Sequence, residues 1–558
     1  MIKNGKYDVL ILMLITLAAG LTGIRWGVPS PELNNLYFSR AEVTEEFLAG
    51  VGGRPVKMLD DDDASKLPRS VYNPIRTYHP DEYYIIKSMA VIKPGEMDFH
   101  PRQFSIGGAY LYPLGALIFL CSKTGFLYLT RDIAHYFAHP VDIARIYFLG
   151  RFVTLVFGMG IVLLVYLTAH IIWKEKRTAF LAGILTIFSP LFLLNIHYMY
   201  VDIPAIFWVM LCMYFSVRYC SGPYRHAPFL MGASAGLAAG SKLTFILSFF
   251  IPALAFLLTV KRDSVRRALK NVLMSGAGFV LLFVITNPYF LFILKELFLG
   301  AGKSNVSFSF EPWFYFQSLT AGMGAVLFYF AVFGVIFGLR RDYGKEKILL
   351  LAWIVFFFLM LSSSAGKFAR YALPVIPPLI IAGAGFWFNP SGGRKITVVL
   401  KKTAYVLAIA FTLVYGTAYE TLFVRENVRT SAGRWIKENI PAGSSVGVTE
   451  VPWQFQMPPF DYAAYDLNVT GYDFPAAAER KPDYFIISSF QAPLPPYPLR
   501  LQKERIDFWH ELINSGMYRE KKVFRKAPSV LGLHFKRDVL PEDMIYLNPS
   551  IVVFERES

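Results

Sequence analysis

The sequence has 558 residues, of which 54% are hydrophobic and only 17% are charged, and its formal net charge is +16. Soluble domains carry about 25% charged residues, so this deficit and the long apolar runs exclude an ordinary soluble protein and indicate a polytopic membrane protein. The basic residues are spread over short loops, which argues against nucleic acid as a partner. Cys121, Cys212 and Cys220 show no metal-binding spacing, so neither a disulfide framework nor a zinc site is expected.

Apolar runs of spanning or near-spanning length recur along the first 420 residues. A segment in lipid must satisfy its backbone hydrogen bonds internally, so each run is expected to be helical. The first run follows Lys3 and Lys6 without a small-residue cleavage site, which predicts an uncleaved span. The runs lie at 7–26, 106–127, 146–173, 178–197, 203–219, 228–241, 243–260, 271–290, 317–339, 347–362, 371–388 and 399–420.

The distribution of basic residues predicts the orientation. If the run at 106–127 does not cross, most loop lysines and arginines fall on one side, as the positive-inside rule expects for the cytoplasm. Pro113 and three nearby glycines also make this run a poor continuous helix, so we expect it on the outer interface as juxtamembrane helices. The prediction is about eleven spans with a cytoplasmic N-terminus. The opposing short loops hold Lys242, Lys295, Lys303, Lys367 and Arg370.

Two polar parts are predicted to lie outside the membrane. The first external loop, with its juxtamembrane helices, covers 28–127 and contains the acidic run Asp60–Asp63, interpreted as a solvated loop rather than a cation site. The second part, 425–558, is expected to form a small α/β domain after a membrane domain at 1–424. Its expected elements are a helix at Ser431–Asn439, strands at Ser445–Thr449 and Tyr484–Ser488, a helix at Ile506–Ser515 and a strand at Ile551–Phe554.

Polar residues that fall on the predicted outer face form the candidate site. Carboxylates are costly near hydrocarbon, so the adjacent acids Asp81 and Glu82 need a chemical reason. Asp202 lies in the turn before the fourth span, and later external turns add cations. The remaining candidates are His79, His100, Arg102, Lys242, Lys367, Arg370 and Tyr371.

A few acids facing several cations suit transfer from a lipid-phosphate donor. Cations bind the phosphate and stabilise its growing negative charge as it leaves. A carboxylate accepts the proton of the attacking hydroxyl. Chemistry outside the cytoplasm on a lipid-linked donor also agrees with the absence of a nucleotide-binding glycine-rich loop.

Each candidate also has a simpler interpretation. Asp81 and Glu82 are suited to starting a helix after Pro80, and Asp202 could act as an N-cap. Lys242 and Arg370 could instead extend toward lipid headgroups. A divalent cation bound by His79 and His100 with Asp81 or Glu82 is a further alternative, and no other cofactor is expected.

These motifs together resemble the membrane glycosyltransferases of the GT-C superfold, closest to the protein O-mannosyltransferase-like and aminoarabinose-transferase-like branch. The resemblance rests on Pro80-Asp81-Glu82, on Asp202 ahead of the fourth span, on Gly240-Ser241-Lys242-Leu243-Thr244, and on the Lys-x-x-Arg-Tyr-x-x-Pro pattern of Lys367–Pro374. It covers about 1–420. Trp435–Pro441 also looks like the external domain of many bacterial and archaeal members.

The resemblance implies transfer of a sugar from a polyprenyl-phosphate carrier, dolichyl or undecaprenyl, usually with inversion. By position it implies that Asp81 is the base, assisted by Glu82 and Asp202. Lys242, Lys367, Arg370 and Arg102 would face the donor phosphate, while His79, His100 and Tyr371 would contact substrate. The acceptor could be lipid, glycan or protein, and the expected location is the cell membrane of a bacterium or archaeon.

Two other classes of function compete with this hypothesis. A transporter or flippase of a lipid-linked anion could use the same cations without chemistry, and a non-catalytic membrane subunit could use the external domain for assembly. A transporter predicts charges at the bilayer midplane and paired broken helices. The charged candidate residues lie at span ends, which favours the enzyme.

Overall fold

The computed structural model describes residues 5–38, 74–103, 105–130, 133–222, 224–262, 264–290, 309–338, 344–388 and 395–557. The chain divides into two compact units. The helical unit comprises Met1–Thr22, Val91–Leu117 and Gly150–Thr417, and the mixed unit comprises Gly23–Ala90, Ile118–Leu149 and Ala418–Ser558. The acidic run Asp60–Asp63 lies outside the described residues. The predicted domain boundary after residue 424 stays a prediction.

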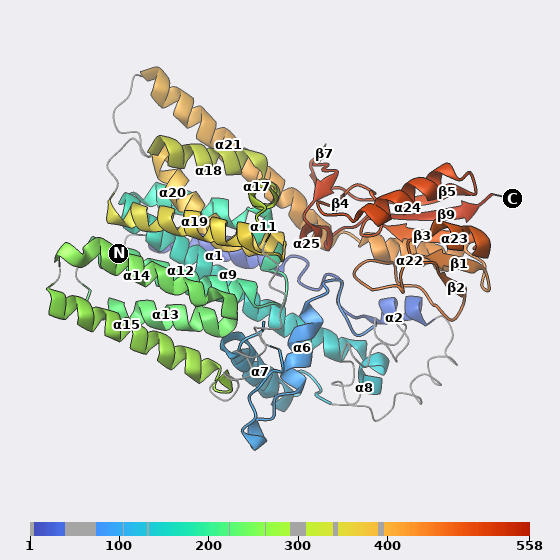
Figure 1. The fold of residues 1–558 in the computed structure, drawn as a ribbon, viewed down its shortest axis with the longest axis horizontal. Coiled ribbons are helices and arrows are strands. Elements are labelled where there is room, and N and C mark those ends of the chain that lie inside the picture. The colour runs from blue at the N-terminus through green and yellow to red at the C-terminus, as the bar shows by residue number, and fades with distance from the viewer. Residues whose placement is uncertain are drawn as a thin grey trace. The chain divides into compact units, whose positions relative to one another are not determined.

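Long helices account for most of the helical unit (Figure 1). All of the predicted apolar runs contain helix, as the need for internal backbone bonding requires. The helices are α1 (Lys6–Leu21), η3 (Pro94–Glu96), α7 (Gly108–Lys123), α9 (Pro140–Trp173), α10 (Lys176–Ile187), α11 (Pro190–Asn195), α12 (Asp202–Ser221), α13 (Ala227–Ser241), η4 (Leu243–Phe249), α14 (Phe250–Thr259), η5 (Val260–Arg262), α15 (Val265–Thr286), α17 (Pro312–Met323), α18 (Ala325–Gly338), α19 (Lys345–Ser363), η6 (Ala369–Val375), α20 (Ile376–Phe388) and α21 (Lys395–Val424).

Glycines bring α13 and α15 into close contact, and the two helices run side by side in Figure 1. A Cβ added at Gly232 would lie 1.8 Å from the carbonyl oxygen of Ser275, and one at Gly236 would lie 2.4 Å from that of Phe279. Small residues at a four-residue spacing permit this backbone approach in membrane helices. The α13–α15 pair therefore depends on the absence of side chains at these positions.

Six helices in the described part of the chain are long and apolar enough to cross a membrane, or seven if one bent pair is counted as a single span. That pair is α17 and α18, which meet at 114°. The continuous span expected at 317–339 is therefore broken, at Gly324, whose φ of +80° favours glycine. Helices such as α10 and α13 are apolar but shorter than about 20 residues, so the number of about eleven spans stays a prediction.

The run at 106–127 forms one helix, α7, despite Pro113 within it. The sequence predicted that this run would be a poor continuous helix, and that prediction was wrong. Pro113 lies in the second turn, where loss of one backbone donor interrupts the hydrogen-bond ladder at a single point. The side of the membrane on which α7 lies stays a prediction.

A five-stranded sheet in the mixed unit has the order β2-β1-β3-β9-β5. Strand β1 pairs in parallel with β2 and β3, whereas β9 is antiparallel to both β3 and β5. The elements of the unit are α2 (Pro31–Tyr37), α6 (Glu82–Ala90), α8 (Ile133–Ala138), α22 (Val428–Asn439), β1 (Ser445–Val448), β2 (Asp466–Val469), α23 (Phe474–Arg480), β3 (Tyr484–Ser488), β4 (Tyr497–Pro498), α24 (Lys503–Asn514), β5 (Tyr518–Phe524), β6 (Ser529–Val530), β7 (Leu533–His534), β8 (Val539–Leu540), α25 (Glu542–Ile545) and β9 (Ile551–Arg556).

Alternating side chains of β3 and β9 form two cores, one on each face of the sheet. Ile486 and Val553 pack with residues of α22, whereas Phe485 and Phe554 pack with residues of α23 and α24. This period of two is what a strand buried on both faces requires. The predicted helices and strands of the C-terminal region are thus confirmed, and they form a three-layer α/β arrangement.

Candidate active site

One carboxylate and two cations form a buried cluster in the helical unit. The Nζ of Lys242 lies 2.6 Å from Oδ1 of Asp202, and the Nε of Arg370 lies 3.4 Å from Oδ2. All three side chains are at most one tenth exposed. The cluster therefore brings together three predicted site residues that are far apart in sequence.

Local structure positions each member of this cluster. Asp202 begins α12, Lys242 is the extended residue between α13 and η4, and Arg370 belongs to η6. No side-chain capping bond is made by Val201, the N-cap residue of α12, and the Asp202 carboxylate bonds to Lys242 instead. Lys242 and Arg370 point inward to this acid, which differs from extension toward headgroups.

Aromatic rings complete the surroundings of the two cations. The Lys242 ammonium lies 4.4 Å from the ring centre of Tyr371, and the Arg370 guanidinium lies 4.3 Å from that of Phe368 and 5.5 Å from that of Tyr200. Ring faces stabilise a cation without neutralising it. The cluster therefore places two cationic hydrogen-bond donors around one carboxylate, an arrangement suited to binding an anion.

The side chain of Lys367 bonds to backbone carbonyl groups. Its ammonium donates to the carbonyl oxygens of Ser309 at 3.1 Å and Ser362 at 2.9 Å. The N–H of Glu311 also donates to the Ser362 carbonyl. Lys367 thereby ties the segment before α17 to the end of α19, which suggests a positioning role for a residue predicted to face phosphate.

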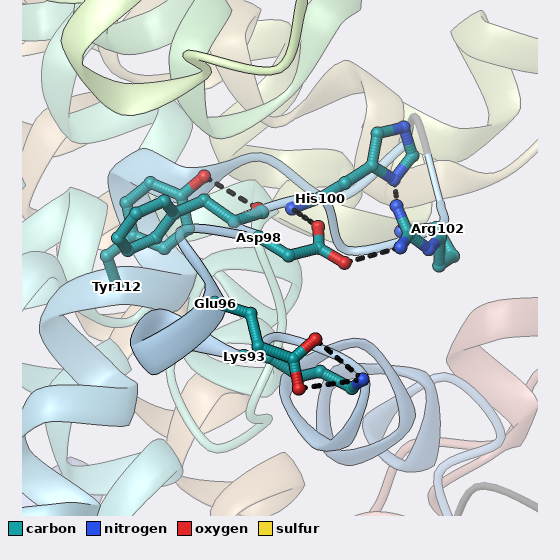
Figure 2. A network of polar contacts seen from close by, with 7 residues as sticks. Lys93, Glu96, Asp98, His100, Arg102 and Tyr112 are labelled. Atoms are coloured by element: carbon teal, nitrogen blue, oxygen red, sulfur yellow. Dashed lines mark hydrogen bonds and ion pairs between the residues drawn. The ribbon is translucent and has the colours of Figure 1, made fainter.

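Asp98 organises the loop that carries His100 and Arg102 (Figure 2). Its carboxylate accepts the N–H of His100 at 3.1 Å and the Arg102 guanidinium at 2.5 Å, while the N–H of Arg102 donates to Nδ1 of His100 at 2.8 Å. These bonds hold Arg102 at a φ of +58°, which is unfavourable for a residue with a side chain. The backbone N–H of His100, and then the Arg102 charge, lower the pKa of Asp98.

The pair predicted first, Asp81 and Glu82, lies in the mixed unit at the start of α6. Glu82 is fully buried, and its Oε2 accepts the hydroxyl of Thr77 at 2.5 Å. Asp81 is only half-buried, and its N–H donates to Nδ1 of His79 at 3.3 Å. The two acids therefore differ in environment, because Asp81 is partly exposed whereas Glu82 is fully buried.

Residues not found from the sequence support this acidic loop. Gln454 donates to the carbonyl of Thr77 at 3.2 Å, and Arg76 donates to that of Pro80 at 3.4 Å. The Arg76 guanidinium lies 5.2 Å from the ring centre of Trp453 and 4.9 Å from that of Tyr83. Gln454 and Trp453 lie more than 370 residues further along the chain, so no local signal could have identified them.

The predicted site residues thus fall in both units. Asp202, Lys242, Lys367, Arg370, Tyr371, His100 and Arg102 belong to the helical unit, and His79, Asp81 and Glu82 belong to the mixed unit. Within the residues that the structure describes, no group of three or more His, Cys, Asp or Glu side chains could hold a metal ion. The alternative of a cation bound by His79, His100, Asp81 and Glu82 gains no support.

Comparison with known proteins gives a match to the family model described as dolichyl-phosphate-mannose-protein mannosyltransferase, over residues 114–298. This segment contains Asp202 and Lys242. An uncharacterized protein of Aquifex aeolicus (strain VF5) is 26% identical over 284 residues, which cover 49% of this chain and 56% of the relative. The chain therefore spans little more than half the length of that curated relative.

Two solved structures align along nearly the whole chain. ArnT from Cupriavidus metallidurans, bound to undecaprenyl phosphate, has 13% identity and a TM-score of 0.45, and 98% of both chains are covered. Arabinofuranosyltransferase AftD from Mycobacteria has 12% identity and a TM-score of 0.45, with 99% of this chain and 40% of that chain covered.

The long apolar helices define a multi-pass membrane protein with a small C-terminal sheet region, as predicted. The family match confirms the predicted resemblance to membrane glycosyltransferases, and glycosyltransferase is the enzyme class that it indicates.

Proposed function

We propose that this protein transfers a sugar from a polyprenyl-phosphate carrier to a hydroxyl acceptor outside the cytoplasm. The observation that carries the proposal is the buried cluster of Lys242 and Arg370 around Asp202. The matching family model, whose name specifies a dolichyl-phosphate sugar donor, supports the same class of carrier. The acceptor is a lipid, glycan or protein, and the membrane is the cell membrane of a bacterium or archaeon.

In the proposed reaction, the acceptor oxygen forms a bond to the anomeric carbon while the bond from that carbon to the phosphate oxygen breaks. The phosphate departs with the electron pair of the broken bond. Lys242 and Arg370 stabilise the negative charge that develops on it, in a buried setting where such charges interact strongly. Direct displacement of this kind inverts the configuration of the anomeric carbon.

Asp81 is proposed to accept the proton of the acceptor hydroxyl. A general base must be accessible to substrate, and Asp81 is the half-buried member of the acidic pair. Glu82 is buried against Thr77, so we assign it the positioning of the loop. Asp202 is assigned the positioning of the two cations rather than proton transfer.

The test is sugar transfer by the full chain in liposomes that contain radiolabelled polyprenyl-phosphate sugars of several kinds. The Asp81→Asn variant should lower the transfer rate by about 10²–10⁴-fold while donor binding persists. Transfer by Asp81→Asn at the native rate would remove Asp81 as the base. Failure of the native protein with every such donor would contradict the proposed function.

The same liposomes distinguish the competing transporter. A flippase would move a fluorescent lipid-linked anion between leaflets without forming a glycosylated product. Lipid movement without transfer in the native protein would favour the transporter. Neither movement nor transfer would favour a non-catalytic assembly subunit.

A further inference from the structure

A pocket with a volume of about 880 Å³ lies in the mixed unit, and Tyr78 of the acidic loop is one of its lining residues. Its walls come from the segment after α1, from the first turns of α9 and from the junction of α21 and α22. The rings of Trp26 and Phe423 meet edge to face at 5.7 Å, and Tyr78 and Thr430 share a hydrogen bond of 2.8 Å. Contacts between distant segments therefore build the pocket.

The charged residues of this pocket are four arginines and two glutamates, which give it a net charge of +2. Arg434 forms ion pairs with both glutamates, at 2.5 Å to Glu32 and 2.8 Å to Glu426. The excess positive charge consequently belongs to the other arginines. These are Arg25, Arg145 and Arg425.

Nothing nearby fully neutralises these three arginines. Arg425 donates to the neutral Ser529, and neither Arg25 nor Arg425 forms an ion pair within the described part of the chain. Arg145 lies 3.3 Å from Asp142, with its side chain 43% exposed. A pocket that keeps several accessible guanidinium groups is suited to phosphate, which accepts two hydrogen bonds from a guanidinium.

The remaining wall of the pocket is apolar and partly open to the surroundings. Phe126 is 44% exposed and Val141 is 47% exposed, and Phe148 also lines the pocket. The Arg145 guanidinium lies 5.7 Å from the ring centre of Phe126. Free phosphate would leave this apolar surface uncovered, whereas a lipid chain would cover it.

The position of the pocket along the chain agrees with a lipid ligand. Arg25 follows the end of α1 by four residues, Arg145 lies in the second turn of α9, and Arg425 directly follows α21. The ends of apolar spanning helices lie at the depth of lipid headgroups, where cationic side chains attract anionic lipids.

From the arginines and the apolar wall together, we propose that this pocket binds the phosphate headgroup of an anionic membrane lipid. Arg25, Arg145 and Arg425 contact the phosphate, and an acyl chain covers Phe126 and Phe148. The proposal does not rest on the transferase activity, because it uses none of the residues assigned to sugar transfer.

The test is native mass spectrometry of the full chain in detergent, titrated with dioctanoyl-phosphatidylglycerol, with dioctanoyl-phosphatidylcholine and with glycerol phosphate. We expect the anionic lipid to bind at least tenfold more tightly than the other two. The double variant Arg25→Gln/Arg145→Gln should weaken its binding by about 25-fold, since each arginine near a membrane surface contributes about fivefold. The matched control Arg519→Gln/Lys521→Gln removes the same charge from β5, where both residues pair with Glu555, and should bind as the native chain does.

A second variant covers the case in which the arginine variant does not fold. Phe126→Ser, at a partly exposed position, should weaken binding of the lipid and leave any binding of glycerol phosphate unchanged. Equal binding of lipid by the native and the double variant would overturn the proposal. Equal affinity for glycerol phosphate and phosphatidylglycerol would also overturn it, in favour of a free-phosphate site.

Discussion

At the scale of single residues, the cluster of Asp202, Lys242 and Arg370 has both a structural and a chemical consequence. Two cations confined around one carboxylate repel each other, and the acid makes their proximity tolerable. Removing the acid leaves that repulsion in place, whereas removing one cation removes the repulsion. Stability and transfer should therefore respond differently to changes at this cluster.

The first prediction separates these two consequences by comparing a single variant with a double variant. Asp202→Asn should destabilise the chain by about 3–5 kcal/mol, because it removes the carboxylate that lies between two buried cations. Asp202→Asn/Lys242→Met should recover part of that stability, because the repulsion between the two cations is gone, but it should still transfer sugar about 10²–10³-fold more slowly, since one phosphate-binding cation is missing. Thermal unfolding and the liposome transfer assay measure the two effects.

Lys437→Met is the matched control, because it replaces a largely exposed lysine of α22. It should change neither the unfolding temperature nor the rate. Recovery of both stability and transfer in the double variant would mean that Lys242 acts only as a partner of Asp202.

The second prediction concerns Asp98 and the loop of Figure 2. Because hydrogen bonds and the Arg102 charge lower the pKa of Asp98 in the folded chain, its contribution to stability is present above the ordinary Asp value of about 3.9. That contribution is lost as pH falls through the lowered folded pKa. Amide hydrogen exchange at His100, whose N–H donates to the Asp98 carboxylate, should therefore show less protection near pH 3 than near pH 6 after correction for intrinsic rates.

The Asp98→Asn variant tests the assignment. It should speed exchange of the His100 amide at both pH values and remove the pH-dependent part of its protection. A pH-dependent loss of protection that persists in Asp98→Asn would trace the effect to another acid.

At the scale of elements, the glycines of α13 set how closely α15 can approach. The third prediction is that Gly236→Ala destabilises the chain by about 1–3 kcal/mol, because its Cβ would lie 2.4 Å from the Phe279 carbonyl oxygen and force the helices apart. Gly276→Ala in α15 is the matched control. A Cβ there meets nothing within 4 Å, so the change should be neutral or stabilise by up to about 1 kcal/mol. Thermal unfolding in one detergent compares the two, and equal effects would contradict the close packing.

At the scale of the whole molecule, the predicted topology places the loop at 174–177 in the cytoplasm and the C-terminal region outside. The fourth prediction uses single cysteines in a chain whose three native cysteines are replaced. Glu479→Cys, exposed in α23, should react with a membrane-impermeant maleimide in intact cells, and Lys176→Cys should react only after permeabilisation. Labelling of both residues from the same side would reverse or break the predicted topology.

Much of the fold could be predicted because it depends on local patterns. Apolar runs longer than a dozen residues must bond their own backbone in lipid, and each became helix in the described chain. Strands β3 and β9, which are buried on both faces, likewise appear in the sequence as short apolar runs, so both strands could be predicted. The break between α17 and α18 was missed, because a single Gly324 inside an apolar run is an ambiguous signal.

The candidate site was only partly predictable. Single charges at span ends identified Asp202, Lys242 and Arg370, since buried or interfacial charges are costly and need a function. Nothing in the local sequence distinguished Lys367, which bonds backbone carbonyls, from Arg370, which faces Asp202. Likewise, no local sequence signal predicted that Arg76 and Gln454 bond to the backbone of the acidic loop.

The sequence by itself thus determined the membrane class, the helices and most of the charged residues at their ends, because hydrophobicity and charge act over a few neighbouring residues. Only the tertiary structure decided which of these charges meet. The ion pair of Asp202 with Lys242 and the arginine pocket join segments separated by tens to hundreds of residues. Such contacts depend on how helices pack, and packing is set by the shapes of many side chains together.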